Sequence, residues 1–530
     1  MADRALPLPV PPALRRLAWL LPPAAGALAA GGFPPVALWP LTLFGLALLV
    51  ALLARAPGPG RAALCGWLWG VGHFSLGNGW IATAFTYQSN MPAALGPVAV
   101  VLLALYLAVF PAAAAALAVA FARGRPTALV PAFAAAWILS EWLRGWLFTG
   151  FPWNPLAVAA LGGPERAGLA QVLPWTGTYA LSGLVALLAA LWWRGWSLRV
   201  ARPGLALLLV AVPLATFRLP QLTPPDPPGR LPFTLVQPGI PQDELDDPAR
   251  FEAQFATAAR LTRAARPAAR RLVLWPESGL PDYLREGYPA WFYAATTYRG
   301  DPVAARARLG RVIGPGGLLL TGAVDLVVER GRAVAARNVV TVVDAGGTIR
   351  GSYAKAHLVP YGEYLPLRAW LTPLGLSRLV PGDFDFAAGP GPRTLALGPW
   401  GRAGVQICYE IVFSGEVIDR ADRPDFLFNP SNDGWFGAAG PPQHLAQARL
   451  RAIEEGVPVL RATTNGISAV IDANGLIRHS LPRPIAGRID GFVPVAHAPT
   501  PFARFGNRLA LVWAAALVLC SMLALWRARG

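Results

Sequence analysis

The chain of 530 residues is too long for one small domain, and its composition is not that of a water-soluble protein. Hydrophobic residues make up 54%, charged residues 14%, and the mean hydropathy is +0.43, values typical of a membrane protein. The net charge of +17 predicts no nucleic-acid partner, because the arginines are scattered and no basic run interleaves with aromatic residues. Cys65 and Cys520 lie in apolar segments, which argues against a disulfide framework.

Eight apolar segments predict membrane-spanning helices. Most of them approach the roughly 20 residues that a helix needs to cross a bilayer, although the first and the seventh are shorter. Arg15 and Arg16 before the first segment resemble the start of a signal peptide, but further segments follow at once, so we interpret it as an uncleaved span. The segments are Leu17–Phe33, Val36–Ala54, Ala62–Trp80, Ala93–Phe121, Ala128–Gly145, Ala167–Trp193, Pro203–Phe217 and Leu509–Trp526.

The arginines predict the orientation of these spans. Every second connection is basic, and the connections between are nearly free of arginine, so the positive-inside rule places both termini in the cytoplasm. Residues 218–508, which hold nearly all the acidic side chains, then lie in the periplasm of a Gram-negative cell. We expect spans in 1–217, a proline-rich linker in 218–232, a water-soluble domain in 233–505, and the eighth span with a cytoplasmic tail in 506–530. The orienting residues are Arg4, Arg15, Arg16, Arg55, Arg61, Arg123, Arg125, Arg194, Arg199, Arg202, Arg527 and Arg529.

The water-soluble block alternates short apolar strands with helices. Helices are predicted over Asp247–Arg270 and His444–Glu455, and two stretches with β-branched runs around glycine-containing turns predict hairpins. The histidines do not cluster and no glycine-rich phosphate loop is present, so we expect no metal site and no cofactor. The strands are "FTLVQPGI", "RLVLWPES", "GLLLTGAV", "RAGVQICYEIVF" ending at Cys408, and "DFLFNPSNDGWFG", and the hairpins are "NVVTVVDAGGTIRGSYAKAH" and "PVLRATTNGISAVIDANG".

Three reactive side chains each follow a predicted strand. Glu277 follows "LVLWP", Cys408 follows "GVQI", and Lys355, the only lysine beside 45 arginines, follows the first hairpin. The carboxyl ends of strands are where sites form in α/β sheets. Each residue alone also fits a structural explanation: a solvated carboxylate, a lysine retained by chance, a packed cysteine. Together they fit nucleophilic catalysis.

The three side-chain types supply complementary chemistry. A cysteine attacks as its thiolate, and with an ordinary pKa of about 8.5 it needs a base at neutral pH. Glu277 is the candidate general base. The Lys355 ammonium would favour the thiolate and stabilise the oxyanion of a tetrahedral intermediate, with the backbone N–H of Tyr409 as the second donor.

The segments "LWPES", "YAKAHLVPYGEYLP" and "VQICYE" resemble the Glu-Lys-Cys triad segments of the nitrilase superfamily, and more closely those of its apolipoprotein N-acyltransferase branch. "FTGFPWNPLA", "FNPSNDGWFG" and "QHLAQARLRAIEEGVPVLRATTNG" are similar to that branch as well. The resemblance implies a multi-pass α-helical domain of about eight spans joined to a periplasmic α/β nitrilase-like αββα sandwich, in a bacterial inner membrane.

By the same resemblance, Glu277 is the general base, Lys355 the oxyanion stabiliser and Cys408 the nucleophile. Glu363 and Glu410 match acidic residues that support such a site, and an ordinary ion pair or turn explains them equally well. Tyr409 and Trp435 match residues near the substrate, with core packing as the alternative for Trp435. The implied reaction moves an acyl chain from a phospholipid to the amine of a diacylglyceryl-cysteine apolipoprotein, through a cysteine thioester with ping-pong kinetics. We expect a monomer.

Two points stay open at this stage. The apolar segment Leu365–Gly375 could be a lid that dips into the membrane interface or an ordinary packed loop. The alternative activities are a membrane-tethered nitrilase-type amidase and a non-catalytic binding module. Eight spans exceed what a tether needs, and the presence of all three reactive residues argues against the binding module.

Overall fold

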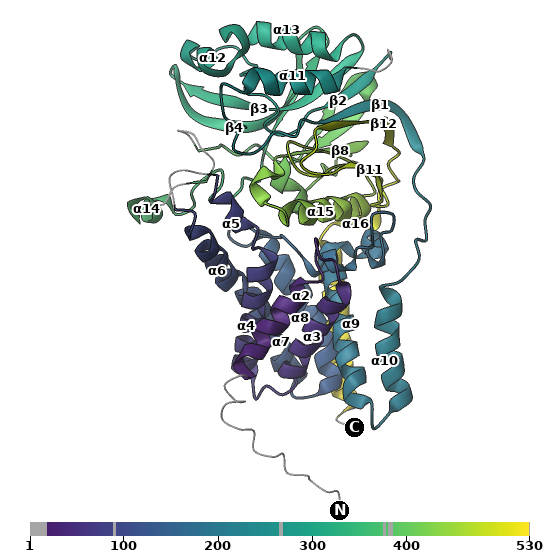
Figure 1. Cartoon of the computed structure of the whole chain (residues 1–530). Coiled ribbons are helices and arrows are strands. Elements are labelled where there is room, and N and C mark those ends of the chain that lie inside the picture. The colour runs from purple at the N-terminus through teal and green to yellow at the C-terminus, as the bar shows by residue number, and fades with distance from the viewer. Residues whose placement is uncertain (1–17, 88–91, 264–268, 375–377, 380–384, 529–530) are drawn as a thin grey trace, which may run out of the picture.

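The structure, a computed structural model, describes residues 18–87, 92–263, 269–374, 378–379 and 385–528. Helices form one half of the molecule and two β-sheets with their covering helices form the other (Figure 1). The chain leaves the helical half after α10 and returns to it as α17. The chain thus forms a helical half and a β-rich half, and its C-terminal helix lies with the first half.

Every predicted apolar segment contains a helix. The fourth segment is broken at Ala108, because Pro111 has no N–H to donate to the Leu107 carbonyl. Among the described residues, four helical stretches could cross a membrane by length and composition: Leu95–Ala122, Pro126–Trp146, Leu169–Leu198 and Arg508–Arg527. The helices are α2 (Leu21–Ala30), α3 (Trp39–Leu53), α4 (Pro59–Gly77), α5 (Ile81–Ala84), α6 (Leu95–Leu107), α7 (Val109–Ala122), α8 (Pro126–Trp146), α9 (Leu173–Leu198), α10 (Pro203–Thr216) and α17 (Arg508–Arg527).

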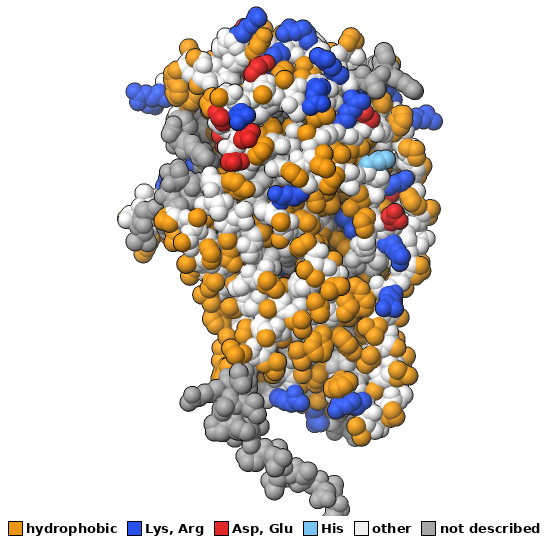
Figure 2. All heavy atoms as spheres, in the orientation of Figure 1, with side chains coloured by type: hydrophobic (Ala, Val, Ile, Leu, Met, Phe, Trp, Pro, Cys, Tyr) orange, Lys and Arg blue, Asp and Glu red, His pale blue; other side chains and the backbone are white. Residues whose placement is uncertain are grey.

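The surface of the helical half is apolar. Figure 2 shows hydrophobic side chains covering the helices, with basic side chains at their lower end and charged side chains over the β-rich half. Large exposed hydrophobic side chains occur on α6, α10 and α17, among them Leu102, Leu207 and Trp513. A surface of this kind is costly in water and suits contact with lipid.

Two six-stranded sheets form the β-rich half. The first has the order β12-β1-β2-β3-β4-β5, in which β1, β2 and β3 are parallel, and the second has the order β11-β10-β9-β8-β7-β6, in which β7, β8 and β9 are parallel. The strands are β1 (Pro228–Gln237), β2 (Arg271–Leu274), β3 (Gly317–Glu329), β4 (Arg332–Asp344), β5 (Ile349–Ala354), β6 (Thr394–Ala396), β7 (Arg402–Val405), β8 (Phe426–Ser431), β9 (Val459–Thr463), β10 (Ser468–Ile471), β11 (Ile477–Leu481) and β12 (Gly487–Pro494).

The two sheets pack face to face as the middle layers of a four-layer sandwich. Alternation along the strands decides which side chains face which layer. On β2, Leu272 and Leu274 join the core between the sheets, whereas Val273 faces the outer helices α11 (Phe251–Thr262) and α13 (Pro302–Ile313). On β8, Phe428 faces the other sheet and Leu427 faces α15 (Gly440–Glu455). The predicted αββα architecture is confirmed.

Helix α15 is shared by the two halves of the molecule. Leu445, Ala448 and Ala452 pack against the second sheet, whereas Leu450 and Ile453 join the core of the helical bundle. The helix thus has no solvent-facing stripe, as expected of a helix buried between two bodies.

Polar contacts fix α15 to the helical half. The side-chain oxygen of Gln443 accepts hydrogen bonds from Trp153 Nε1 (2.8 Å) and Asn154 Nδ2 (2.9 Å). Its amide nitrogen donates to the carbonyls of Pro34 (3.0 Å) and Gly77 (3.2 Å). One amide therefore joins three separate segments of the helical half to the β-rich half.

Some predicted boundaries were wrong. Helix α11 begins at Phe251 instead of Asp247, because the Asp247 side chain accepts from Ala249 N (3.0 Å) and Pro248 follows it, which holds this stretch in a turn; its predicted end included residues 264–268, outside the described chain. Helix α15 begins at Gly440, four residues before its predicted start. Strand β7 ends at Val405 instead of Cys408, and a 3₁₀ turn, η7 (Cys408–Val412), follows.

Several elements carry no clear sequence signal. The remaining helical elements are α12 (Ala290–Thr296), α14 (Arg368–Leu371), α16 (Pro501–Phe505), η1 (Ala18–Leu20), η2 (Leu156–Ala160), η3 (Leu169–Val172), η4 (Tyr298–Gly300), η5 (Thr372–Leu374), η6 (Gly398–Trp400) and η8 (Asp433–Phe436).

We predict that Gln443→Leu lowers the apparent melting temperature of the detergent-solubilised protein. The substitution leaves two buried donors, on Trp153 and Asn154, without their acceptor, at a cost of about 1–3 kcal/mol each. Gln447, one turn along the same helix, is buried but its amide atoms have no hydrogen-bond partner among the described residues. Gln447→Leu is the matched control, and equal losses in the two variants would contradict the role given to Gln443.

Candidate active site

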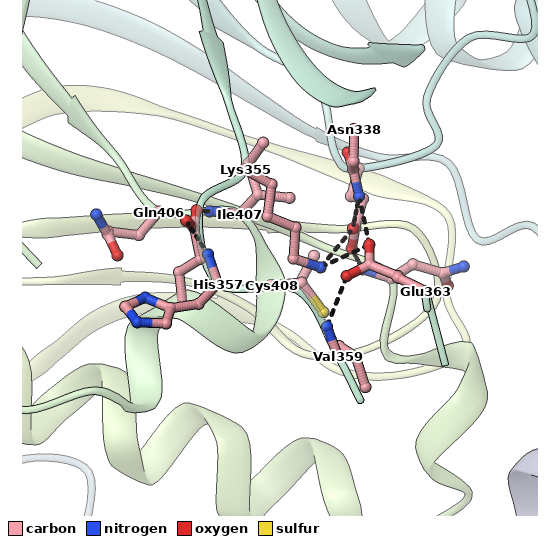
Figure 3. A network of polar contacts seen from close by, with 12 residues as sticks. Asn338, Lys355, His357, Val359, Glu363, Gln406, Ile407 and Cys408 are labelled. Carbon is pink, nitrogen blue, oxygen red and sulfur yellow. Dashed lines mark hydrogen bonds and ion pairs between the residues drawn. The ribbon is translucent and has the colours of Figure 1, made fainter. Parts of the chain in front are cut away.

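Glu277, Lys355 and Cys408 converge between the two sheets. Glu277 lies three residues beyond β2 and Lys355 directly follows β5, both in the first sheet, whereas Cys408 lies three residues beyond β7 of the second sheet. The site is therefore not one edge of a single sheet, as the strand pattern suggested, but the place where two sheets face each other. Figure 3 shows the Lys355 ammonium, the Glu363 carboxylate and the Cys408 sulfur directed toward one another.

Glu277 is held by hydrogen bonds to both carboxylate oxygens. Its Oε1 accepts from Asn338 Nδ2 (2.6 Å) and its Oε2 accepts from the backbone N–H of Asn432 (2.8 Å). Thr464 Oγ1 donates to its backbone carbonyl (2.6 Å). The backbone of β3 also approaches closely at Gly322, where a Cβ would lie 2.7 Å from the Cα of Glu277. A carboxylate fixed in this way can present one oxygen to a reacting proton.

Lys355 is a fully enclosed ammonium with two carboxylate neighbours. Only 1% of its surface is exposed, and its Nζ lies 2.9 Å from Glu363 Oε1 and 3.7 Å from Glu277 Oε1. Burial by itself lowers the pKa of Lys355, but the charges of Glu363 and Glu277 outweigh burial and raise that pKa above its ordinary value. The side chain is therefore a permanent cation at physiological pH.

Glu363 positions the lysine and its loop. Besides the ion pair, its Oε2 accepts from the backbone N–H of Val359 (2.8 Å), and its Oε1 also accepts from Asn338 Nδ2 (3.2 Å). Asn338 thus bridges Glu277 and Glu363 and keeps the two like charges in place on either side of the ammonium. The predicted supporting residue Glu363 therefore contacts a member of the triad directly.

Cys408 is buried and has an unusual backbone conformation. Its exposed fraction is 5% and its φ is +51°, in the left-handed region that a non-glycine residue adopts only when its surroundings enforce it. Burial raises the pKa of the Cys408 thiol well above its ordinary value, and the Glu277 charge raises it further, against the opposing charge of Lys355. The group is therefore a thiol near neutral pH.

Glu410 joins the cysteine turn to the lysine loop without contacting the triad side chains. Its Oε2 accepts from Ile407 N (2.7 Å), while its Oε1 accepts from Tyr353 OH (2.8 Å), Ala356 N (2.7 Å) and His357 N (3.2 Å). Burial raises the pKa of Glu410, and these hydrogen bonds to the carboxylate oppose that rise. The geometry supports a positioning role for this predicted supporting residue.

Tyr409 and Trp435 lie farther from the charged centre. The Tyr409 hydroxyl donates to the Gly150 carbonyl (3.3 Å) of the helical half. Trp435, in η8, is partly exposed and makes an edge contact with Tyr87, with ring centroids 6.1 Å apart. A substrate-binding role for Trp435 stays a prediction.

The segment after Glu363 is apolar and exposed. Leu367, just before α14, exposes 68% of its surface, and Trp370, within α14, exposes 78%. Leu365 is buried. The alternative of an ordinary packed loop therefore does not hold for Leu367 and Trp370. Gly375, at the end of the predicted lid, lies outside the described residues.

Sequence reasoning missed several residues of the site. Asn338 bridges the two carboxylates, and His444, Asp433 and Arg461 form a buried chain behind Cys408. His444, Asp433 and Arg461 all lie in segments that resemble the acyltransferase branch, so the signal was the motif and not the residue type. Asn338 lies in the middle of β4, just before an ordinary β-branched run, and no local pattern marks it. Among the described residues, no three His, Cys, Asp or Glu side chains form a metal-ligand group.

Two family models match successive parts of the chain. Residues 25–191 match the family model "apolipoprotein N-acyltransferase N-terminal domain", and residues 234–483 match the model "carbon-nitrogen hydrolase". An amidase of the nitrilase superfamily from Nesterenkonia is 19% identical, covering 54% of this chain and 98% of its own, with a TM-score of 0.34.

Proteins named apolipoprotein N-acyltransferase align over nearly the whole length. The protein from Rhodopseudomonas palustris is 33% identical and covers 94% of each chain. That from Sinorhizobium medicae is 36% identical, covering 89% of this chain and 88% of its own, and that from Bradyrhizobium diazoefficiens is 35% identical, covering 94% and 93%. With this identity over both halves of the molecule, the chain belongs to the apolipoprotein N-acyltransferase family.

Proposed function

We propose that this enzyme transfers an acyl chain from a phospholipid to the N-terminal amine of a diacylglyceryl-cysteine apolipoprotein, through a thioester on Cys408. Besides the family, one observation carries the proposal: a buried thiol, carboxylate and ammonium meet in a domain that packs directly on an apolar helical bundle. That placement suits two substrates whose acyl chains stay in the membrane, where each buried CH₂ is worth about 0.8 kcal/mol.

In the first half-reaction, Glu277 takes the thiol proton as the Cys408 sulfur attacks the ester carbonyl of the phospholipid. The oxyanion is stabilised by Lys355 Nζ and the N–H of Tyr409. The intermediate collapses, the carbonyl carbon–oxygen bond to the glycerol breaks, and Glu277 returns the proton to the leaving alkoxide. A lysophospholipid departs and the acyl thioester remains.

In the second half-reaction, the lipoprotein amine attacks the thioester carbonyl. Glu277 takes a proton from the amine nitrogen, and the same two donors stabilise the oxyanion. The carbon–sulfur bond breaks, the sulfur regains its proton from Glu277, and the amide product leaves. One ester and one amine become one alcohol and one amide, with the enzyme unchanged, as in ping-pong catalysis.

The burial of Cys408 protects the acyl thioester from hydrolysis. Transfer to the amine competes with hydrolysis, and a site enclosed by two sheets and by Lys355, Glu363 and Asn338 limits the approach of water. The exposed segment at Leu367 and Trp370 would insert into the membrane interface beside the site as a lid.

We place the chain in the bacterial inner membrane with eight spans, both termini in the cytoplasm, and the nitrilase-like domain of residues 233–505 in the periplasm, as a monomer. The arginine distribution and the apolar surface of the helical half support this arrangement. A tethered amidase is the weaker alternative, because the similarity to the acyltransferases includes residues 25–191 of the helical half.

The thioester predicts a mass change that intact mass spectrometry detects. After incubation with phospholipid vesicles and no acceptor, the purified protein gains one acyl chain, and a diacylglyceryl-cysteine peptide discharges it. Cys408→Ala abolishes the gain, whereas Cys520→Ala, on the exposed face of α17, loads normally. An adduct that persists in Cys408→Ala would contradict the assignment of the nucleophile.

The same measurement tests why the site holds a lysine. Lys355→Arg should slow loading by roughly 10²-fold or more. The planar guanidinium is larger than the ammonium, and in a site where the side chain is only 1% exposed it cannot occupy the position of Nζ between Glu363 and Glu277. Loading at the normal rate would show that charge alone suffices.

Glu277→Gln should change two rates of Cys408 in opposite directions. Because the Glu277 charge raises the pKa of Cys408, its removal lowers that pKa and increases the thiolate fraction at a fixed pH below it. Alkylation by iodoacetamide therefore becomes faster, whereas acyl loading falls roughly 10²–10⁴-fold because no base carries the proton. The assay uses a Cys65→Ala, Cys520→Ala background, with the exposed Glu286→Gln as control. Slower alkylation in Glu277→Gln would contradict the electrostatic assignment.

The proposed orientation predicts which positions react with a membrane-impermeant maleimide in cells whose outer membrane is permeabilised and whose inner membrane is intact. In the background without Cys65 and Cys520, Val303→Cys on α13 should be labelled, whereas Val200→Cys, between α9 and α10, should be labelled only after lysis. Both side chains are exposed, at 51% and 87%. Labelling of Val200→Cys in intact cells would reverse the orientation.

A further inference from the structure

The peptide group between Cys408 and Tyr409 has one end held and one end free. The Cys408 carbonyl oxygen lies 3.0 Å from His444 Nε2 and accepts a longer hydrogen bond from Asn429 Nδ2 (3.5 Å). At the other end, the Tyr409 N–H has no acceptor among the described residues. In a trans peptide the carbonyl and the N–H are coplanar and point in opposite directions. Whatever orients the carbonyl therefore also aims the N–H.

His444 belongs to a fully buried chain of three side chains. Its Nδ1 lies 3.0 Å from Asp433 Oδ1 and 3.0 Å from Arg461 Nη2. Arg461 Nη2 contacts both oxygens of Asp433, at 2.8 and 2.7 Å. None of the three side chains exposes any surface, so none can exchange these contacts for hydrogen bonds to water.

The protonation of this chain follows from its surroundings. Burial and then the Arg461 charge lower the pKa of His444, so the imidazole is neutral near pH 7. The Cys408 carbonyl can only accept, so Nε2 carries the hydrogen, and Nδ1 accepts from Arg461. Burial alone would raise the pKa of Asp433, but the charge of Arg461, which contacts both carboxylate oxygens, lowers that pKa to about 2 and keeps the carboxylate charged. In this arrangement the hydrogen of the neutral His444 ring faces the Cys408 carbonyl.

We propose that Arg461, Asp433 and His444 form a positioning clamp that aims the Tyr409 N–H at the reacting carbonyl by holding the opposite end of the same peptide group. This inference rests on the proposed function, in which that N–H is the second oxyanion donor. Cys408 has a left-handed φ, which persists only when its surroundings enforce it, and the clamp is what holds the Cys408 carbonyl in that conformation.

Arg461 serves a second contact with the same peptide. Its Nη1 donates to Asn429, whose amide in turn donates to the carbonyls of Gln406 (2.6 Å) and, more weakly, Cys408. One guanidinium therefore orders both groups that contact the Cys408 carbonyl. Because His444 acts only through this backbone carbonyl, it is a positioning residue and not a proton-transfer group.

The test compares two reactions of Cys408 that differ in their need for an oxyanion donor. Acylation by p-nitrophenyl butyrate passes through an oxyanion, whereas alkylation by iodoacetamide does not. In the Cys65→Ala, Cys520→Ala background, His444→Leu should slow acylation by roughly 10²-fold, the effect of losing one oxyanion donor, while alkylation stays within about threefold. His444→Gln, whose amide can still donate to the Cys408 carbonyl, should retain most of the acylation rate.

Two further variants separate the clamp from general destabilisation. Ile453→Val removes a methylene from the same helix without touching the clamp, and the ratio of acylation to alkylation should not change. Arg461→Lys keeps a charge beside Asp433 but loses the planar fork that reaches Asn429 and His444, and should lower the ratio about tenfold, so it tests the clamp even if His444→Leu does not fold. An unchanged ratio in His444→Leu or in Arg461→Lys, or an equal fall of both rates, would overturn the clamp.

The soluble ester also keeps this test distinct from that of the proposed function. Normal loading by the ester with none by phospholipid would overturn the proposed acyl donor and leave the clamp to be judged by the ratio. Failure of the parent protein to react with either the ester or the phospholipid would overturn both.

Discussion

An ammonium sealed from water is stable only where negative charge faces it, and the site of this enzyme is arranged around that requirement. Glu363 lies 2.9 Å from Lys355 Nζ and Glu277 lies 3.7 Å away, so two carboxylates surround one cation and the set carries a formal charge of −1. Burial, and then the charge of Glu277, raise the pKa of Cys408 against the opposing charge of Lys355, so a further anion is unfavourable there and Cys408 is a thiol near neutral pH. In the proposed mechanism, Glu277 loses its charge when it takes the thiol proton, as the oxyanion gains one. The charge near Lys355 is thus kept nearly constant through each step.

The three candidate side chains could be selected from the sequence because each follows a pattern that is recognisable locally. A strand is recognisable from a short apolar run, and a reactive residue just after it lies at a sheet edge, so Glu277, Lys355 and Cys408 could be selected one by one. The helical segments were recognisable for the same reason. What the local pattern cannot report is pairing between distant strands. The site lies between two sheets, and no feature of "RLVLWPES" or "VQICYE" says that their strands belong to different ones.

The features that sequence reasoning missed depend on contacts between residues that are far apart in the sequence. Asn338 is 61 positions from Glu277, and an amide side chain within a strand has many structural uses. Glu410 bends the chain after Ile407 by accepting from that residue's N–H, which ended β7 earlier than the apolar run predicted. The left-handed conformation of Cys408 gives no signal either, since glycine and not cysteine is the usual residue there. Such features follow from tertiary contacts that the fold must first bring together.

Neighbouring residues on α15 face opposite ways. Gln443 forms hydrogen bonds to segments of the helical half, and the next residue, His444, contacts the carbonyl of Cys408. The enzyme is therefore not modular, although its sequence divides cleanly at a proline-rich linker. A water-soluble version obtained by cutting there would uncover Leu450 and Ile453, remove every partner of Gln443, and loosen the helix that carries His444. For the same reason, a compound that wedges between α15 and the bundle could inactivate the enzyme without ever entering the site.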